Sequence, residues 1–120
     1  MAKNTRQTGS GCETTAALFL EGQNYVILER NYRCRRGEID IIARDGSCLV
    51  FAEVKYRHSG AAGDPLEAVD RRKQKRICYT ALWYLKAKNI DPEGPIRFDV
   101  IGMTDNDIIH IKNAFDFTFS

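Results

Sequence analysis

The fold is decided by the stretch GEIDIIARDGSCLVFAEVK, residues 37–55, in which two apolar runs rich in β-branched residues flank Asp45-Gly46. An Asp-Gly pair between two such runs is a strong signal for a β-hairpin with a two-residue loop. That loop would place Arg44 opposite Ser47 and fix the register of the two strands. We therefore predict a hairpin over this stretch as the centre of the fold.

Each strand of this hairpin carries an acidic residue, Asp40 in the first and Glu53 in the second. Side chains alternate between the two faces of a strand, so Glu53 and Lys55 share a face. The register sets Asp40 opposite Phe51, on that same face and diagonal to Glu53, with about 7 Å between the Cβ atoms. Two carboxylates at this spacing can bind one divalent cation. The alternative is a hairpin with a solvated polar face, and an odd loop length would put Asp40 on the other face.

Composition limits the class of protein. The chain has 120 residues, which predicts a single domain over residues 11–120 after a disordered polar tail over residues 1–10. Its 18 Lys and Arg residues against 16 Asp and Glu residues give a net charge of only +2, so binding to nucleic acid would depend on local clusters. The sequence has no apolar run of membrane-spanning length and no signal peptide, which predicts a cytoplasmic protein without membrane contact. The four cysteines lack zinc-site spacing and are expected to be thiols.

Other patterns predict the elements around the hairpin. An apolar stripe indicates a helix from Cys12 to about Gly22. A longer stripe predicts a helix from Pro65 to about Lys88, with Asp64 as its N-cap. Further strands are predicted over residues 25–32, 96–102 and 107–111. The order of helix, three strands, helix and two strands is typical of an α/β sandwich with a mixed sheet.

Five short strings in this chain resemble those of a known family. They are RNYR (30–33), GEID (37–40), VFAEVKYR (50–57), RFDVI (97–101) and NAF (113–115). The chain resembles the YraN family of small bacterial proteins, which is assigned to the restriction-endonuclease-like PD-(D/E)XK nuclease superfamily. The resemblance runs from about Gly11 to Phe115. It implies a restriction-endonuclease-like α/β/α sandwich with a mixed central sheet, and a function on nucleic acid.

The resemblance also implies catalytic and metal-binding residues. Asp40 and Glu53 would bind Mg²⁺ or Mn²⁺ through hard oxygen ligands. Glu13 would complete the metal site, because many nucleases of this fold place a glutamate on the opening helix. The family has Gly-Glu at this place and this chain has Cys12-Glu13, and the other interpretation of Glu13 is a helix-capping charge. Lys55 would orient the attacking water or stabilise negative charge.

Basic residues gather in three places and are expected to contact the phosphate backbone. Lys73 falls on the apolar stripe of the long helix, where it either reaches the solvent edge or points to the carboxylates. A solvated face is the alternative for all of these charges. The expected nucleic-acid-binding residues are Arg33, Arg35, Arg36, Arg57, Arg71, Arg72, Lys73, Lys75 and Arg76.

The leading hypothesis is a metal-dependent endonuclease that hydrolyses phosphodiester bonds, with DNA as the expected substrate and repair or recombination as the setting. The alternative is a non-catalytic nucleic-acid-binding module that keeps the nuclease fold. A third hypothesis is a structural protein whose carboxylates only neutralise lysines. Many nucleases of this fold dimerise, so a homodimer is compatible with the resemblance.

Overall fold

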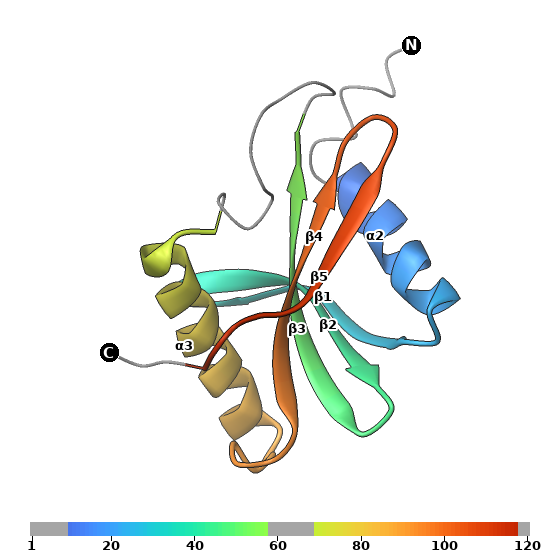
Figure 1. Cartoon of the computed structure of the whole chain (residues 1–120). Coiled ribbons are helices and arrows are strands. Elements are labelled where there is room, and N and C mark those ends of the chain that lie inside the picture. The colour runs from blue at the N-terminus through green and yellow to red at the C-terminus, as the bar shows by residue number, and fades with distance from the viewer. Residues whose placement is uncertain (1–9, 58–68, 118–120) are drawn as a thin grey trace.

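The computed structural model describes residues 10–57 and 69–117 (Figure 1). Within these ranges the elements follow the order expected from the sequence. They are α2 (Ser10–Gly22), β1 (Val26–Cys34), β2 (Gly37–Asp45), β3 (Cys48–Tyr56), α3 (Arg71–Ala87), β4 (Ile96–Met103) and β5 (Ile108–Phe115). The tail expected over residues 1–10 lies outside the described residues except for Ser10, which begins α2.

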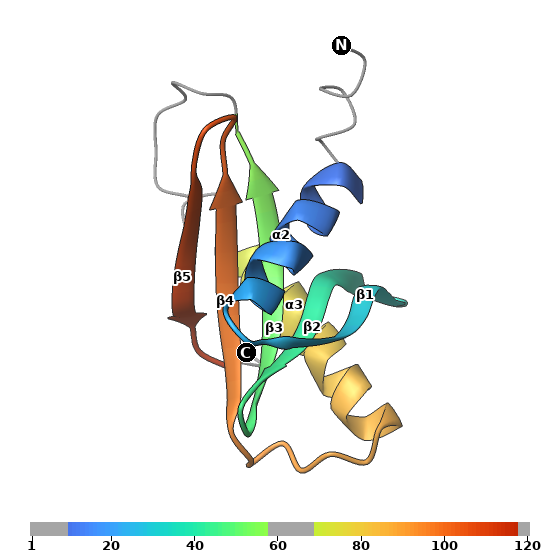
Figure 2. The same cartoon turned by 90° about the vertical axis from the view of Figure 1, so that its right-hand side faces the viewer.

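The five strands form one mixed sheet in the order β1-β2-β3-β4-β5. The pairs β1–β2, β2–β3 and β4–β5 are antiparallel, and β3–β4 is parallel. A parallel pair needs a long crossover connection, and α3 lies in that connection. The two described helices cover opposite faces of the sheet (Figures 1 and 2). The expected α/β/α sandwich with a mixed central sheet is thus confirmed.

Each helix closes one hydrophobic core against the sheet. On the α3 side, Phe51 and Phe98 are stacked with 5.5 Å between ring centroids, and Phe98 also packs on Phe115 and Phe117. Phe51 is 1% exposed, and its truncation to alanine would cost about 3–5 kcal/mol. On the α2 side, small residues let the helix lie close to the strands. This second core comprises Cys12, Ala16, Ala17, Leu20, Tyr25, Ile41, Ala43, Val50, Ala52, Ile101 and Met103.

The hairpin loop lies one residue further along the chain than predicted. Asp45 pairs with Cys48, so Gly46 and Ser47 form the loop and the predicted pairing of Arg44 with Ser47 is wrong. Gly46 has a φ of 62°, a left-handed conformation that suits glycine in a two-residue hairpin loop. Because both registers have a two-residue loop, the shift keeps the predicted faces for the residues of the ladder, from Ile41–Ala52 to Asp45–Cys48. Asp40 and Glu53 lie beyond the end of this ladder.

The start of the long helix was also predicted wrongly. α3 begins at Arg71, and Asp70 is its N-cap, with the Asp70 Oδ1 accepting a hydrogen bond of 2.9 Å from the backbone N–H of Lys73. Val69 is buried in the core but precedes the helix. The predicted cap and first turn, residues 64–66, lie outside the described residues.

Three further observations complete the fold. Asp99, a buried acid in β4, is neutralised by Arg97 at 2.9 Å and contacted by the Nε2 of His110 at 2.7 Å. The four cysteines form no disulfide in the described parts of the chain, which contain all of them. No helix within the described residues is long and apolar enough to cross a membrane.

Candidate metal and phosphate site at the fork of the sheet

The sheet forks where β2 leaves β3. Their ladder ends at the pair Ile41–Ala52, while β2 continues to pair with β1 as far as Gly37. Ile39 packs in the α3 core and Ile41 in the α2 core, although alternate residues of a regular strand share a face. The strand therefore changes direction at Asp40. Figure 2 shows the β1–β2 hairpin turning away from the long β3–β5 ribbon.

Asp40 closes the ladder at the fork with its side chain. Its Oδ2 accepts a hydrogen bond of 2.8 Å from the backbone N–H of Val54, which would otherwise lack a strand partner there. Val54 is the middle residue of the Glu53-Val54-Lys55 segment. Asp40 of β2 is thus hydrogen-bonded directly to the backbone of the Glu-x-Lys segment of β3.

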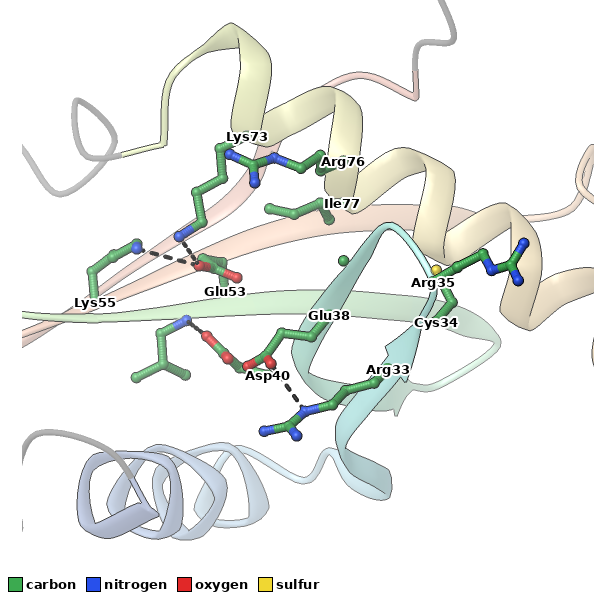
Figure 3. Close-up of a pocket in the computed structure, with 12 residues that line it drawn as sticks. Arg33, Cys34, Arg35, Glu38, Asp40, Glu53, Lys55, Lys73, Arg76 and Ile77 are labelled. Carbon is green, nitrogen blue, oxygen red and sulfur yellow. Dashed lines mark hydrogen bonds and ion pairs between the residues drawn. The ribbon is translucent and has the colours of Figure 1, made fainter.

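A cavity of about 750 Å³ opens at this fork (Figure 3). Its walls come from the β1–β2 turn, the fork itself and the first two turns of α3. The lining residues are Arg33, Cys34, Arg35, Gly37, Glu38, Asp40, Glu53, Val54, Lys55, Lys73, Arg76 and Ile77. Asp40, Glu53 and Lys55, predicted to converge from the hairpin alone, therefore line one cavity.

Three carboxylates meet on the α2 side of the fork. One oxygen from each of Glu13, Glu38 and Asp40 lies within 4.8 Å of the other two. The Oε1 of Glu13 is buried and has no hydrogen-bond partner among residues 10–57 and 69–117. A buried acceptor without a donor costs free energy, and a bound cation would remove that cost.

The pKa of Asp40 is raised to about 8, chiefly by burial and next by repulsion from Glu53. Glu13 and Glu38 make smaller contributions in the same direction, while the hydrogen bond from Val54 acts to lower the pKa. At neutral pH the Asp40 carboxyl group therefore holds a proton, which a divalent cation would have to displace.

Glu53 lies on the α3 side of the fork and is held by two lysines (Figure 3). Its Oε2 is 3.0 Å from the Nζ of Lys73 and 3.4 Å from the Nζ of Lys55. The side chain of Glu53 is only 7% exposed, so these ion pairs provide most of its charge compensation. Lys73 thus points to the carboxylates, one of the two orientations considered from the sequence.

The two lysines differ in their affinity for a proton. Burial lowers the pKa of Lys55, and the adjacent Lys73 lowers it further. Burial also acts to lower the pKa of Lys73, but its hydrogen bonds with Lys55 and Glu53 outweigh burial and leave the pKa raised. Of the pair, Lys55 loses its proton first and Lys73 remains the cation.

The expected phosphate-binding residues do not all reach the cavity. Arg33, Arg35, Lys73 and Arg76 line it, and Arg36 lies in a neighbouring pocket. The others lie outside the lining within the described ranges: Arg71, Arg72 and Lys75 are exposed on α3, and Arg57 is half-buried just after β3.

Glu38 was not predicted as a site residue. It lies two positions before Asp40, and that spacing was the available signal, because alternate residues tend to share a face. Its Oε1 is 3.1 Å from the Nε of Arg33, with both side chains largely exposed. An exposed ion pair of this kind contributes little to stability, so Glu38 can turn to another cation at small cost.

The donor set fits a hard divalent cation. Glu13, Glu38 and Asp40 supply carboxylate oxygens from α2 and β2, and no histidine or cysteine sulfur shares this cluster in the described residues. Glu53, which was expected to bind the same cation, lies outside the cluster and pairs with Lys55 and Lys73. Oxygen donors suit Mg²⁺ and Mn²⁺, whereas zinc sites usually recruit sulfur or imidazole.

Comparison with known proteins gives the family. The model described as "Uncharacterised protein family UPF0102" matches residues 12–103. A UPF0102 protein of Lachnoclostridium phytofermentans is 50% identical over 113 residues, which cover 94% of this chain and 96% of that protein. A UPF0102 protein of Geobacter metallireducens is 46% identical over 124 residues, covering 99% of this chain and 100% of that protein. The chain therefore belongs to the uncharacterised protein family UPF0102, the family of the YraN proteins that it resembles.

Proposed function

We propose that this protein is a metal-dependent phosphodiesterase of the PD-(D/E)XK superfamily that cleaves nucleic acid, with DNA as the expected substrate. The observation that carries the proposal is the fork of the sheet, where four carboxylates and two lysines line or border one cavity. Three arginines on the same walls, Arg33, Arg35 and Arg76, would contact the phosphate backbone.

Glu13, Glu38 and Asp40 would hold Mg²⁺ or Mn²⁺, with Glu53 on the other side of the fork. The chemistry that such a cation supplies is neutralisation of phosphate charge and a lower pKa for water. The Oε1 of Glu13 supports this role, because it is a buried acceptor that has no hydrogen-bond donor in the described parts of the chain.

Lys55 and Lys73 would divide the proton chemistry. Lys55, whose pKa burial lowers, can accept the proton of the attacking water as a neutral amine. Lys73 keeps its charge and stabilises the negative oxygens of the phosphate in the transition state. Arg76 and Arg35 would hold the flanking phosphates without reading sequence.

A cleavage assay in Mn²⁺ or Mg²⁺ over branched, flapped, single-stranded and duplex DNA tests the proposal. We expect the wild type to cut at least one substrate and Asp40→Asn or Glu13→Gln to cut none. The matched control is Glu21→Gln, because Glu21 is an exposed glutamate of the same helix. The control must cut like the wild type.

One observation favours the alternative of a binding module without catalysis. Both lysines form ion pairs with the same oxygen of Glu53, and these pairs neutralise the carboxylate without a metal ion. Salt-sensitive binding by the purified wild type without cleavage in either metal would establish the alternative. Absence of salt-sensitive binding to any DNA or RNA would overturn both functions.

A further inference from the structure

A second, smaller cavity adjoins the carboxylate site. Its volume is about 370 Å³, within the range of small-ligand sites. It lies between the β1–β2 turn and the outer side of α3. Its lining residues are Cys34, Arg35, Arg36, Tyr79 and Trp83.

The two cavities adjoin each other at the β1–β2 turn, because Cys34 and Arg35 line both of them. Figure 3 shows these two residues beside α3 at the end of the larger cavity. The turn is packed tightly on the helix. A Cβ on Gly37 would lie 3.1 Å from the Oγ1 of Thr80, and Cys34 lies 3.5 Å from the same oxygen. The walls of the small cavity are therefore fixed relative to the carboxylates.

The small cavity combines an open aromatic face, that of Trp83, with two arginines. Trp83 is 53% exposed, whereas Tyr84, its neighbour on the inner side of α3, is 4% exposed. Tyr79 lies one helical turn before Trp83 and carries the guanidinium of Arg36 at 4.9 Å from its ring centroid. Stacking holds Arg36 in place, so less side-chain entropy is lost when it contacts a phosphate. A tryptophan this exposed beside two arginines is typical of an interaction site rather than of a core.

We propose that this cavity binds an unpaired nucleobase, which stacks on Trp83 while Arg35 and Arg36 contact its phosphates. A base inside a duplex already stacks on its neighbours and cannot present a face to Trp83. The substrate of the adjacent site is therefore a strand that is single or locally unpaired, such as a flap or a branch. The inference that the bound strand is also cut rests on the proposed nuclease function, whereas the binding of the base to Trp83 does not.

Intrinsic fluorescence tests this directly, because Trp83 is the only tryptophan of the chain. The protein is titrated with short oligothymidylate, oligouridylate and a DNA duplex in the presence of chelator, so that no cleavage intervenes. Stacking of a base on Trp83 should quench its emission with the single strands and leave it unchanged with the duplex. Quenching by either single strand supports the site, and the ratio of the two affinities assigns DNA or RNA.

Variants give the second readout, measured as anisotropy of labelled strands. Trp83→Ala should weaken single-strand binding by about 5- to 150-fold, the usual effect of losing one stacked base, and weaken duplex binding by less than about twofold. Trp83→Phe, which keeps an aromatic face, should retain most of the affinity. Leu18→Ala, a control at a residue 63% exposed on the helix of the opposite face, should match the wild type.

Unchanged Trp83 emission at saturation, or equal losses for single strand and duplex in Trp83→Ala, would overturn the base-binding site. Those outcomes leave the nuclease proposal standing if the wild type still cuts. Conversely, selective single-strand binding through Trp83 without cleavage in Mg²⁺ or Mn²⁺ would overturn the nuclease proposal and leave the base-binding site established.

Discussion

Replacement of Asp40 by asparagine should stabilise the protein in the absence of divalent metal, and increasingly so as the pH rises. The amide oxygen of asparagine can still accept the hydrogen bond from Val54, so the substitution removes the charge and keeps the closure of the fork. In the wild type, burial and repulsion from Glu53 together raise the pKa of Asp40 from 3.8 to about 8. The folded state therefore binds a proton that the unfolded state has already released between these two values, and stability falls as the pH rises through that window.

Each unit of pKa shift corresponds to about 1.4 kcal/mol. The stability difference between Asp40→Asn and the wild type should thus grow by about 4 kcal/mol between roughly pH 5 and pH 8, and level off above the folded-state pKa. Below about pH 4, where both states of the wild type hold the proton, the pH-dependent part of the difference disappears.

Urea unfolding in chelator at a series of pH values measures this difference. Glu21→Gln, at an exposed position, should stay within about 0.5 kcal/mol of the wild type throughout. A difference between Asp40→Asn and the wild type that is flat with pH, or that shrinks as the pH rises, would refute the picture of a buried carboxyl group repelled by its neighbours.

Mn²⁺ at about 100 times its dissociation constant should stabilise the wild type by about 3 kcal/mol, which corresponds to a rise of roughly 10 °C in Tm in a thermal melt. Glu13→Gln should lose most of this rise, and equal rises in both proteins would place the metal elsewhere. The rate of cleavage by the wild type should increase with pH as Lys55 loses its proton. Lys55→Arg, whose side chain stays charged, should bind the substrate but not cut it. An active Lys55→Arg variant would assign Lys55 an electrostatic role instead. Replacement of both Arg72 and Arg76 by alanine should flatten the slope of log affinity against log salt on duplex DNA by roughly 2. Replacement of the exposed Lys112 on β5 should leave that slope unchanged. An unchanged slope in the double variant would exclude this part of α3 from the phosphate contacts.

Strand alternation explains the hairpin pairs from Ile41–Ala52 to Asp45–Cys48, because a two-residue loop fixes the parity of the pairing wherever it lies. Asp40, Glu53 and Lys55 lie beyond the end of this ladder, so their meeting at one cavity depends on the fork as well. The exact loop was not predictable from local signals. Asp45 stays in the ladder, where its Oδ2 lies 3.1 Å from the Nη1 of Arg97 on β4. That ion pair joins residues far apart in the sequence, and it competes with the local preference of Asp-Gly for the loop.

The fork itself also depends on tertiary structure. The change of direction at Asp40 arises because Ile39 and Ile41 enter different cores, and each of these cores is complete only once its own helix, α3 or α2, has docked on the sheet. The start of α3 was ambiguous for a simpler reason: Asp64 and Asp70 are both acceptable N-caps, and the helical stripe continues across both. Glu38 could have been found from its spacing, whereas its proximity to Glu13 required the position of α2.

The parallel pairing of β3 with β4, from Leu49–Ile96 to Tyr56–Met103, has a consequence for the kinetics of folding. The β1–β3 meander contains only local contacts, but the β3–β4 pair must wait until the chain has closed the long crossover that contains α3. Asp40 and Glu53 therefore approach each other before Lys73 arrives to neutralise Glu53. We therefore predict that deprotonation of Asp40 slows folding, because the two carboxylates would meet before Lys73 can compensate their charge. The charges of the site would then affect the rate of folding as well as the stability of the native state.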